Sequence, residues 1–129
     1  MEFKMKEEVG FKADLEFGTL EVAGQDEYGF RPYQLMVASV AVCSGGVLRK
    51  ILEKKRLDIS DITIQADVER NEAEADRIEK MNIHFIIKGK DLEQRKIERS
   101  MELAKKNCSM AQSVKDSIMI NETFELIEG

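Results

Sequence analysis

The first part of the chain alternates apolar and polar residues with a period of two. Between Phe3 and Val22 the apolar residues fall mostly on odd positions, and Gly10 and Gly18 interrupt the run. Such alternation is typical of strands with one buried face, and glycines between them mark turns. We therefore predict two or three short antiparallel strands, followed by a polar loop at Gly24–Phe30.

A long helix is predicted over Tyr33–Arg56. Pro32, the only proline of the chain, precedes it and suits the first turn of a helix. The first half is apolar on every side, and its candidate core residues are Leu35, Ala38, Val42, Leu48 and Leu52. Small residues there, with Gly45 and Gly46 among them, would let another backbone approach closely, so we expect a second helix to cross at this point.

Two paired strands are predicted after the long helix. Alternating residues run through Ile62–Val68 and again through Ile83–Ile87, with a polar segment at Glu69–Lys80 between them. His84 falls on the polar side of the second strand, where we expect it to face solvent or a hydrogen-bonding partner.

The last third predicts two helices and a strand. We expect Asp91 to cap a helix that ends at Asn107. Ser109 and Gln112 have capping-box spacing, which predicts a short helix from Met110 to about Lys115. A strand from Ile118 to Leu126 then follows, with Glu122 breaking its apolar pattern. The order of elements shows no βαβ alternation and predicts an α+β fold, with residues 1–129 as a single domain.

Charge and composition exclude some classes of partner. Twenty basic residues against twenty-five acidic ones give a net charge of −5 and a pI near 5.1, which argues against a general binder of nucleic acid or anionic membranes. The N-terminal segment has early acidic residues and no apolar core of a signal peptide. The apolar stretch Leu35–Leu48 is shorter than the roughly 20 residues that span a bilayer. We expect a cytoplasmic protein that does not bind membranes.

The two cysteines, Cys43 and Cys108, are the candidate chemical groups. With a single histidine they make a poor metal-ligand set, so no metal is expected. Each could simply be a small buried hydrophobe, or the pair could carry redox chemistry. Local sequence favours a thiolate at Cys108, which lies beside a predicted helix start and two lysines, Lys105 and Lys106. Cys43 lies inside an apolar helix, which would raise its pKa.

Three features together resemble the OsmC/Ohr family of osmotically inducible and organic hydroperoxide resistance proteins. They are the segment RPYQLMVASVAVCSGGVLRKIL at Arg31–Leu52, the strand pair after it, and KKNCSMAQSV at Lys105–Val114. A proline stands eleven residues before the first cysteine, small residues surround that cysteine, and the second cysteine precedes a short C-terminal helix.

The resemblance implies an OsmC-like fold with antiparallel sheets around a long central helix, assembled as an intertwined homodimer. Each interface site would hold both cysteines of one chain. Cys43 would be the peroxidatic thiol, which attacks an organic hydroperoxide, and Cys108 the resolving thiol, which forms a disulfide with it. A dithiol reductant would restore both thiols, and no cofactor is implied.

Two positions depart from the hydroperoxide reductases that the chain resembles. Those proteins have a glutamate after the helix-starting proline, which orients an arginine toward the peroxidatic thiolate. Here that position is Tyr33, and residues 1–30 contain no arginine. Lys12 or Arg31 could replace the cation, and Gln34 could donate a hydrogen bond into the site. Without such a cation we expect the pKa of Cys43 near or above the ordinary thiol value of about 8.5.

Two other functions stay open at this point. The same interface cavity could bind an apolar or sulfur-containing small molecule, with the cysteines only as contacts. Alternatively, the protein could be a structural dimer in which both cysteines are core residues.

Overall fold

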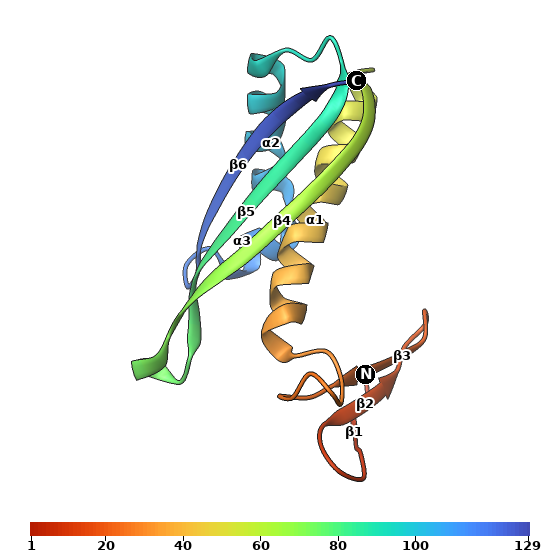
Figure 1. Ribbon diagram of the computed structural model, residues 1–129, viewed down its shortest axis with the longest axis vertical. Coiled ribbons are helices and arrows are strands. Elements are labelled where there is room, and N and C mark those ends of the chain that lie inside the picture. Colours follow the sequence, from red (N-terminus) through yellow and green to blue (C-terminus); the bar gives the residue numbers. More distant parts are fainter. The chain divides into compact units, whose positions relative to one another are not determined.

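The computed structural model describes all 129 residues, which divide into two units, Met1–Met36 and Val37–Gly129. Each unit is described by itself. Helix α1 (Pro32–Lys54) starts in the first unit and continues through the second, close to the predicted range of Tyr33–Arg56 (Figure 1). That residues 1–129 act as one domain stays a prediction.

The first unit contains a small antiparallel sheet of three strands in the order β1-β2-β3. They are β1 (Lys4–Met5), β2 (Phe11–Asp14) and β3 (Thr19–Val22). Gly10, just before β2, has a φ of 84°, and a Cβ built on it would lie 2.4 Å from the carbonyl oxygen of Val22. Glycine is therefore required at this turn, as the alternating pattern implied.

The second unit is built on a mixed sheet in the order β4-β5-β6. Strands β4 (Asp58–Asn71) and β5 (Arg77–Lys90) form an antiparallel hairpin. Strand β6 (Met119–Glu128) pairs with β5 in parallel, with Phe85 opposite Phe124. The expectation of purely antiparallel sheets is therefore wrong for this strand pair. Parallel pairing requires a crossover, and here the crossover holds two helices.

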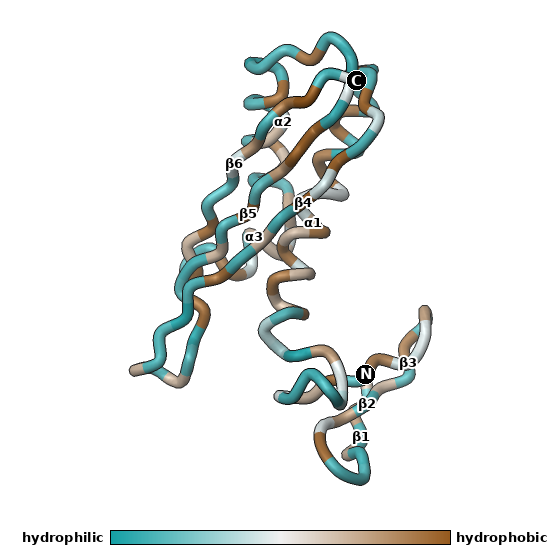
Figure 2. Tube along the Cα trace, in the orientation of Figure 1, coloured by the Kyte–Doolittle hydropathy of each residue, from teal (hydrophilic) through white to brown (hydrophobic).

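The β4–β5 hairpin is longer than the sequence predicts. Most of the polar segment Glu69–Lys80 belongs to the two strands, and only a 3₁₀ turn at Glu72–Glu74 and the next two residues connect them. The end of the hairpin is hydrophilic (Figure 2). Cross-strand charges such as Lys80 and Glu69, 3.4 Å apart, pair there. The hydrogen-bonded pairing of β4 with β5 thus extends into a segment whose sequence has no alternation of apolar and polar residues.

Helices α1, α2 (Gln94–Asn107) and α3 (Ser109–Val114) cover one face of the sheet (Figure 1). The end of α2 at Asn107 is as predicted, but both predicted caps are wrong. Asp91 has a φ of 54° and lies before the true cap position, Glu93, whose side chain makes no cap bond. The cap of α3 is Cys108, not Ser109, because the Cys108 sulfur accepts the N–H of Ala111 at 3.4 Å.

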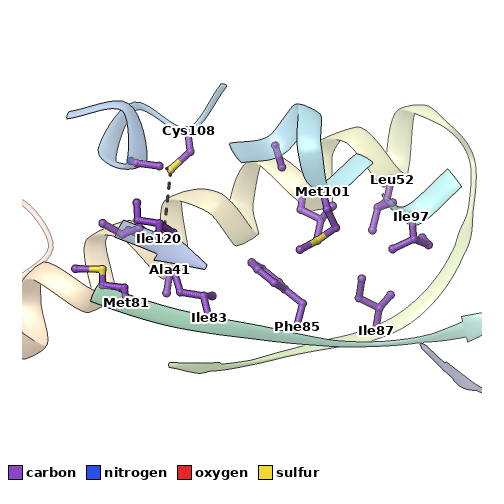
Figure 3. Close-up of a cluster of buried hydrophobic side chains, with 14 of the residues drawn as sticks. Ala41, Leu52, Met81, Ile83, Phe85, Ile87, Ile97, Met101, Cys108 and Ile120 are labelled. Carbon is purple, nitrogen blue, oxygen red and sulfur yellow. Dashed lines mark hydrogen bonds between the residues drawn. The ribbon is translucent and has the colours of Figure 1, made fainter. Parts of the chain in front are cut away.

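The hydrophobic core lies between the helices and the inward side of the sheet (Figure 3). Alternate residues of β5 point into it, as the period of a strand requires. Helix α1 contributes a stripe along one side. The buried residues of these two elements are Met81, Ile83, Phe85, Ile87, Gly89, Val40, Ala41, Ser44, Gly45, Leu48 and Leu52.

By length and composition alone, α1 could cross a membrane. It has 23 residues, and its most apolar 18-residue window has a mean hydropathy of 1.7. This window is longer than the apolar stretch Leu35–Leu48 from which the length was judged in the sequence. One third of that window is buried inside the protein, and core helices of soluble proteins meet the same criterion. The finding by itself does not place α1 in a bilayer.

Gly45 brings α1 close to the sheet, and this contact can be tested. A Cβ at position 45 would lie 2.5 Å from the δ-methyl group of Ile64 on β4. We expect Gly45→Ala to change the free energy of unfolding by less than about 1 kcal/mol, because the δ-methyl group of Ile64 ends a flexible side chain that can rotate away, while alanine gains about 1 kcal/mol in helix propensity. Ile64→Val removes that methyl group, so the double variant should be more stable than the sum of the two single substitutions predicts, as measured by urea unfolding. Strict additivity of the two substitutions would contradict this contact.

Candidate functional site

The two cysteines meet where α1 passes the start of α3. Both are free thiols, Cys43 half-buried and Cys108 fully buried. Ser44 and Gly45 face the sheet. Cys43 precedes them by one residue, a turn of about 100° around the helix axis, so it lies on the side of α1 next to the sheet-facing stripe. There the Cys43 sulfur lies 3.7 Å from the hydroxyl oxygen of Ser109 and in hydrogen-bond contact with the thiol of Cys108.

Cys108 belongs to the core, and its thiol is held in its protonated form. The thiol of Cys108 lies at the edge of the core (Figure 3). Its S–H donates to the carbonyl oxygen of Val40 at 3.9 Å, while its sulfur accepts the N–H of Ala111. Burial raises the pKa of Cys108, and the neighbouring Cys43 raises it further. The expectation of a thiolate at Cys108 is therefore wrong, because desolvation outweighs the helix-start N–H groups.

The pKa of Cys43 is shifted in the opposite direction to that of Cys108. The backbone N–H of Met110 lowers its pKa most, and the thiol of Cys108 and the hydroxyl and N–H of Ser109 lower it too, against the opposing effect of burial. The pKa of Cys43 is thus below its ordinary value, not near or above it as expected. The helix start that the sequence reveals does stabilise a thiolate, but it stabilises the other thiol, which only the folded chain brings to it.

A second polar group lies next to the thiols on the sheet side of α1. Ser44, fully buried, donates to the carboxylate of Glu122 on β6 at 3.0 Å. Burial raises the pKa of Glu122, and Ser44 and Lys105 partly offset that rise. Lys105 also donates to the carbonyl oxygen of Ile120 at 2.8 Å. This link was not predicted from the sequence, in which its one signal is Glu122, an acidic residue within an apolar strand.

The three supporting residues predicted from the sequence lie in the Met1–Met36 unit. The guanidinium of Arg31 lies over the ring of Tyr33, 4.9 Å from its centre. The side-chain oxygen of Gln34 accepts the N–H of Arg31 at 3.1 Å, which caps the start of α1. Their role at the thiols stays a prediction.

The structure offers no metal centre. It places no group of three or more His, Cys, Asp or Glu side chains together in a way that could hold an ion. His84 lies on the sheet face away from the helices, where Thr123 at 2.7 Å and Glu125 at 3.1 Å hydrogen-bond its two ring nitrogens. Histidine is thus not part of the thiol site.

Comparison with known proteins decides the family. The sequence profile described as "OsmC-like protein" matches residues 24–123, which include both cysteines and every element from α1 to the middle of β6. The chain belongs to the OsmC-like family. The resemblance and the α+β fold that the sequence analysis predicted are thereby confirmed.

Three proteins illustrate what this OsmC-like protein is similar to. Protein YhfA of Escherichia coli K12 is 29% identical over 97 residues, covering 74% of this chain and 72% of YhfA. A hypothetical protein from Aquifex aeolicus VF5 has the same fold, with a TM-score of 0.89, 25% identity, and coverage of 99% and 95% of the two chains. An organic hydroperoxide resistance protein OsmC from Legionella pneumophila matches with a TM-score of 0.73 and 15% identity, covering 95% and 94%. The last likeness shows the fold alone.

The lowered pKa of Cys43 is open to direct titration. We expect Ser109→Ala to raise it, because the thiolate loses the Ser109 hydroxyl as a donor. A higher pKa means less thiolate at pH 7, so alkylation should slow at pH 7 and reach the wild-type rate at high pH. Ultraviolet thiolate absorbance against pH, recorded in a Cys108→Ser background, measures the shift.

Ser113→Ala is the matched control for this titration. Ser113 lies on the same helix, but its hydroxyl donates to the carbonyl oxygen of Ser109 and touches neither thiol. The control should leave the pKa of Cys43 in place. Equal shifts in both variants would mean that α3 moves as a whole and that the Ser109 hydroxyl has no specific effect.

Proposed function

We propose that this OsmC-like protein is a cytoplasmic, thiol-dependent peroxidase that reduces organic hydroperoxides, with Cys43 as nucleophile and Cys108 as resolving thiol. The observation that carries the proposal is the asymmetry of the pair. A half-exposed thiol with a lowered pKa touches a fully buried thiol with a raised pKa. The first suits attack on a substrate, and the second suits a partner that stays protonated until it is needed.

The reaction proceeds in three balanced steps. The Cys43 thiolate attacks the terminal peroxide oxygen, so that an S–O bond forms, the O–O bond breaks, and the alkoxide leaves and takes up a proton as the alcohol. The Cys108 thiol then displaces water from the Cys43 sulfenic acid and forms a disulfide. An external dithiol reduces that disulfide to two thiols and is itself oxidised to a disulfide.

Backbone N–H groups lower the pKa of Cys43, a role that the family resemblance assigns to an arginine. The N–H of Met110 is the largest influence that lowers the pKa of Cys43, and no charged side chain is among the groups acting on that thiol. Hydrogen bonds from N–H groups stabilise a thiolate without a formal charge. The departures at Tyr33 and in residues 1–30 are therefore compatible with a reactive Cys43.

Those same departures support a second candidate, a dimer that binds an apolar or sulfur-containing small molecule without turnover. Arg31 and Tyr33 interact with each other. In this case Cys43 would still ionise readily but would not consume peroxide in repeated cycles. The rate of repeated peroxide consumption distinguishes the peroxidase from the binding protein.

Stopped-flow reaction with cumene hydroperoxide and with hydrogen peroxide tests the peroxidase. We expect the reduced protein to consume the organic substrate faster and to form a Cys43–Cys108 disulfide, found by peptide mapping. Cys43→Ser should abolish consumption, because no nucleophile remains. Cys108→Ser should react once and stop, because its sulfenic acid has no thiol partner. Fast thiol alkylation without peroxide consumption would refute the enzyme and leave the binding candidate.

We further propose that two copies of this chain form the homodimer that the family resemblance implies. Each unit leaves apolar surface exposed. In the Val37–Gly129 unit, the outer side of α1 exposes small residues and Val42, which is 67% exposed. In the Met1–Met36 unit, the exposed side chains include Phe3, Met5, Phe11, Phe17 and Phe30. A second copy would cover such surfaces.

A charged residue introduced on the outer side of α1 tests whether two chains form a dimer through this surface. We expect Val42→Glu to convert the dimer to a monomer in sedimentation at micromolar concentration, because a carboxylate would be buried against the partner. Leu103→Glu on α2 is the matched control, since Leu103 is a similarly exposed apolar residue outside that surface. A stable monomer of the wild-type chain would contradict the proposal.

A further inference from the structure

A cleft of about 470 Å³ lies between α2, α3 and β6. Its apolar lining includes Ala111, Ile118, Met119 and Ile120. Ile118 and Ile120 also belong to the hydrophobic core, whereas Met119 is 62% exposed. The volume falls in the range of small-molecule sites, about 300 to 1,000 Å³.

Positive charge surrounds this apolar cleft, although the protein as a whole is acidic. Three lysines line it, Lys105, Lys106 and Lys115, against one acidic residue, Glu102. Lys105 already donates to the carbonyl oxygen of Ile120. The ammonium groups of Lys106 and Lys115 make no ion pair or hydrogen bond in the structure, even though the net charge of the chain is −5. Two unpaired cations beside apolar side chains therefore form the recognition surface.

We propose that this cleft binds the anionic head and the first part of the chain of a medium-chain fatty acid. A carboxylate would pair with Lys106 and Lys115, and the alkyl chain would cover Met119, the one apolar lining residue that is mostly exposed. A compact inorganic anion would leave Met119 exposed to water, and a neutral alkane would leave the lysines unpaired. An amphiphilic anion satisfies both parts of the cleft.

The fatty-acid site is separate from the thiols but shares α3 with them. Ala111 contributes to the cleft, while its backbone N–H holds the sulfur of Cys108. Neither cysteine lines the cleft. Binding there needs no thiol chemistry, so it holds whether or not the peroxidase proposal does.

Calorimetric titration of the wild-type protein with decanoate tests the site. We expect saturable binding of one decanoate per chain, unchanged in Cys43→Ser. Lys106→Glu and Lys115→Glu should each weaken it by about fivefold, as the loss of an exposed charge interaction predicts. Lys50→Glu is the charge-matched control, because Lys50 is an exposed lysine of α1 outside the cleft, and it should bind decanoate as the wild type does.

Two further measurements locate the ligand. Decanol, which lacks the charge, should bind more weakly than decanoate, and Met119→Gln should weaken both ligands by removing apolar contact. Decanoate should shift the NMR signals of Ile118 and Met119 before those of Val42. The proposal fails if decanoate does not bind saturably, if Lys50→Glu weakens binding as much as Lys115→Glu does, or if the shifts appear first at Val42.

Discussion

The packing of α1 against the sheet is the contact on which the rest of the structure depends. One stripe of α1 faces the sheet, and at Gly45 the two approach so closely that even one methyl group would collide with Ile64. This contact fixes the rotation of the helix about its axis. Cys43, one helical step away, must then point toward α3, and Val42 must point outward. A sheet contact thus decides which thiol is accessible.

The difference between the two thiols arises from consecutive backbone groups at one turn. The N–H of Ala111 reaches Cys108, and that of Met110 acts on Cys43. Both sulfurs thus receive hydrogen bonds from the same helix start, and burial makes them differ. The lowered pKa of Cys43 therefore depends on the position of the α3 start, since Met110 and Ser109 supply most of the groups that lower it.

Sequence patterns predicted the order of elements well, because periodicity reports directly on burial. The long helix, the strand pair and the final strand all follow from it. The details that failed depend on contacts between distant residues. The hairpin extends past its apolar residues through charged pairs such as Lys80 and Glu69, and a sulfur serves as cap at Cys108. The electrostatics of Cys43 depend on residue 110, which no local pattern around position 43 can reveal.

The parallel pairing of β5 with β6 has a consequence for how the chain matures during synthesis. Helix α1 and the β4–β5 hairpin leave the ribosome before α2, α3 and β6, at a stage when Cys43 has been made but the segment around Cys108 has not. The side chains of Ile118 and Ile120, which share the core with Cys108, come later still, with the final strand. Parallel strands cannot pair until their whole crossover exists. The nascent chain therefore passes through an interval in which Cys43 exists without Cys108, Ser109 and Met110, the residues whose groups lower its pKa in the folded protein.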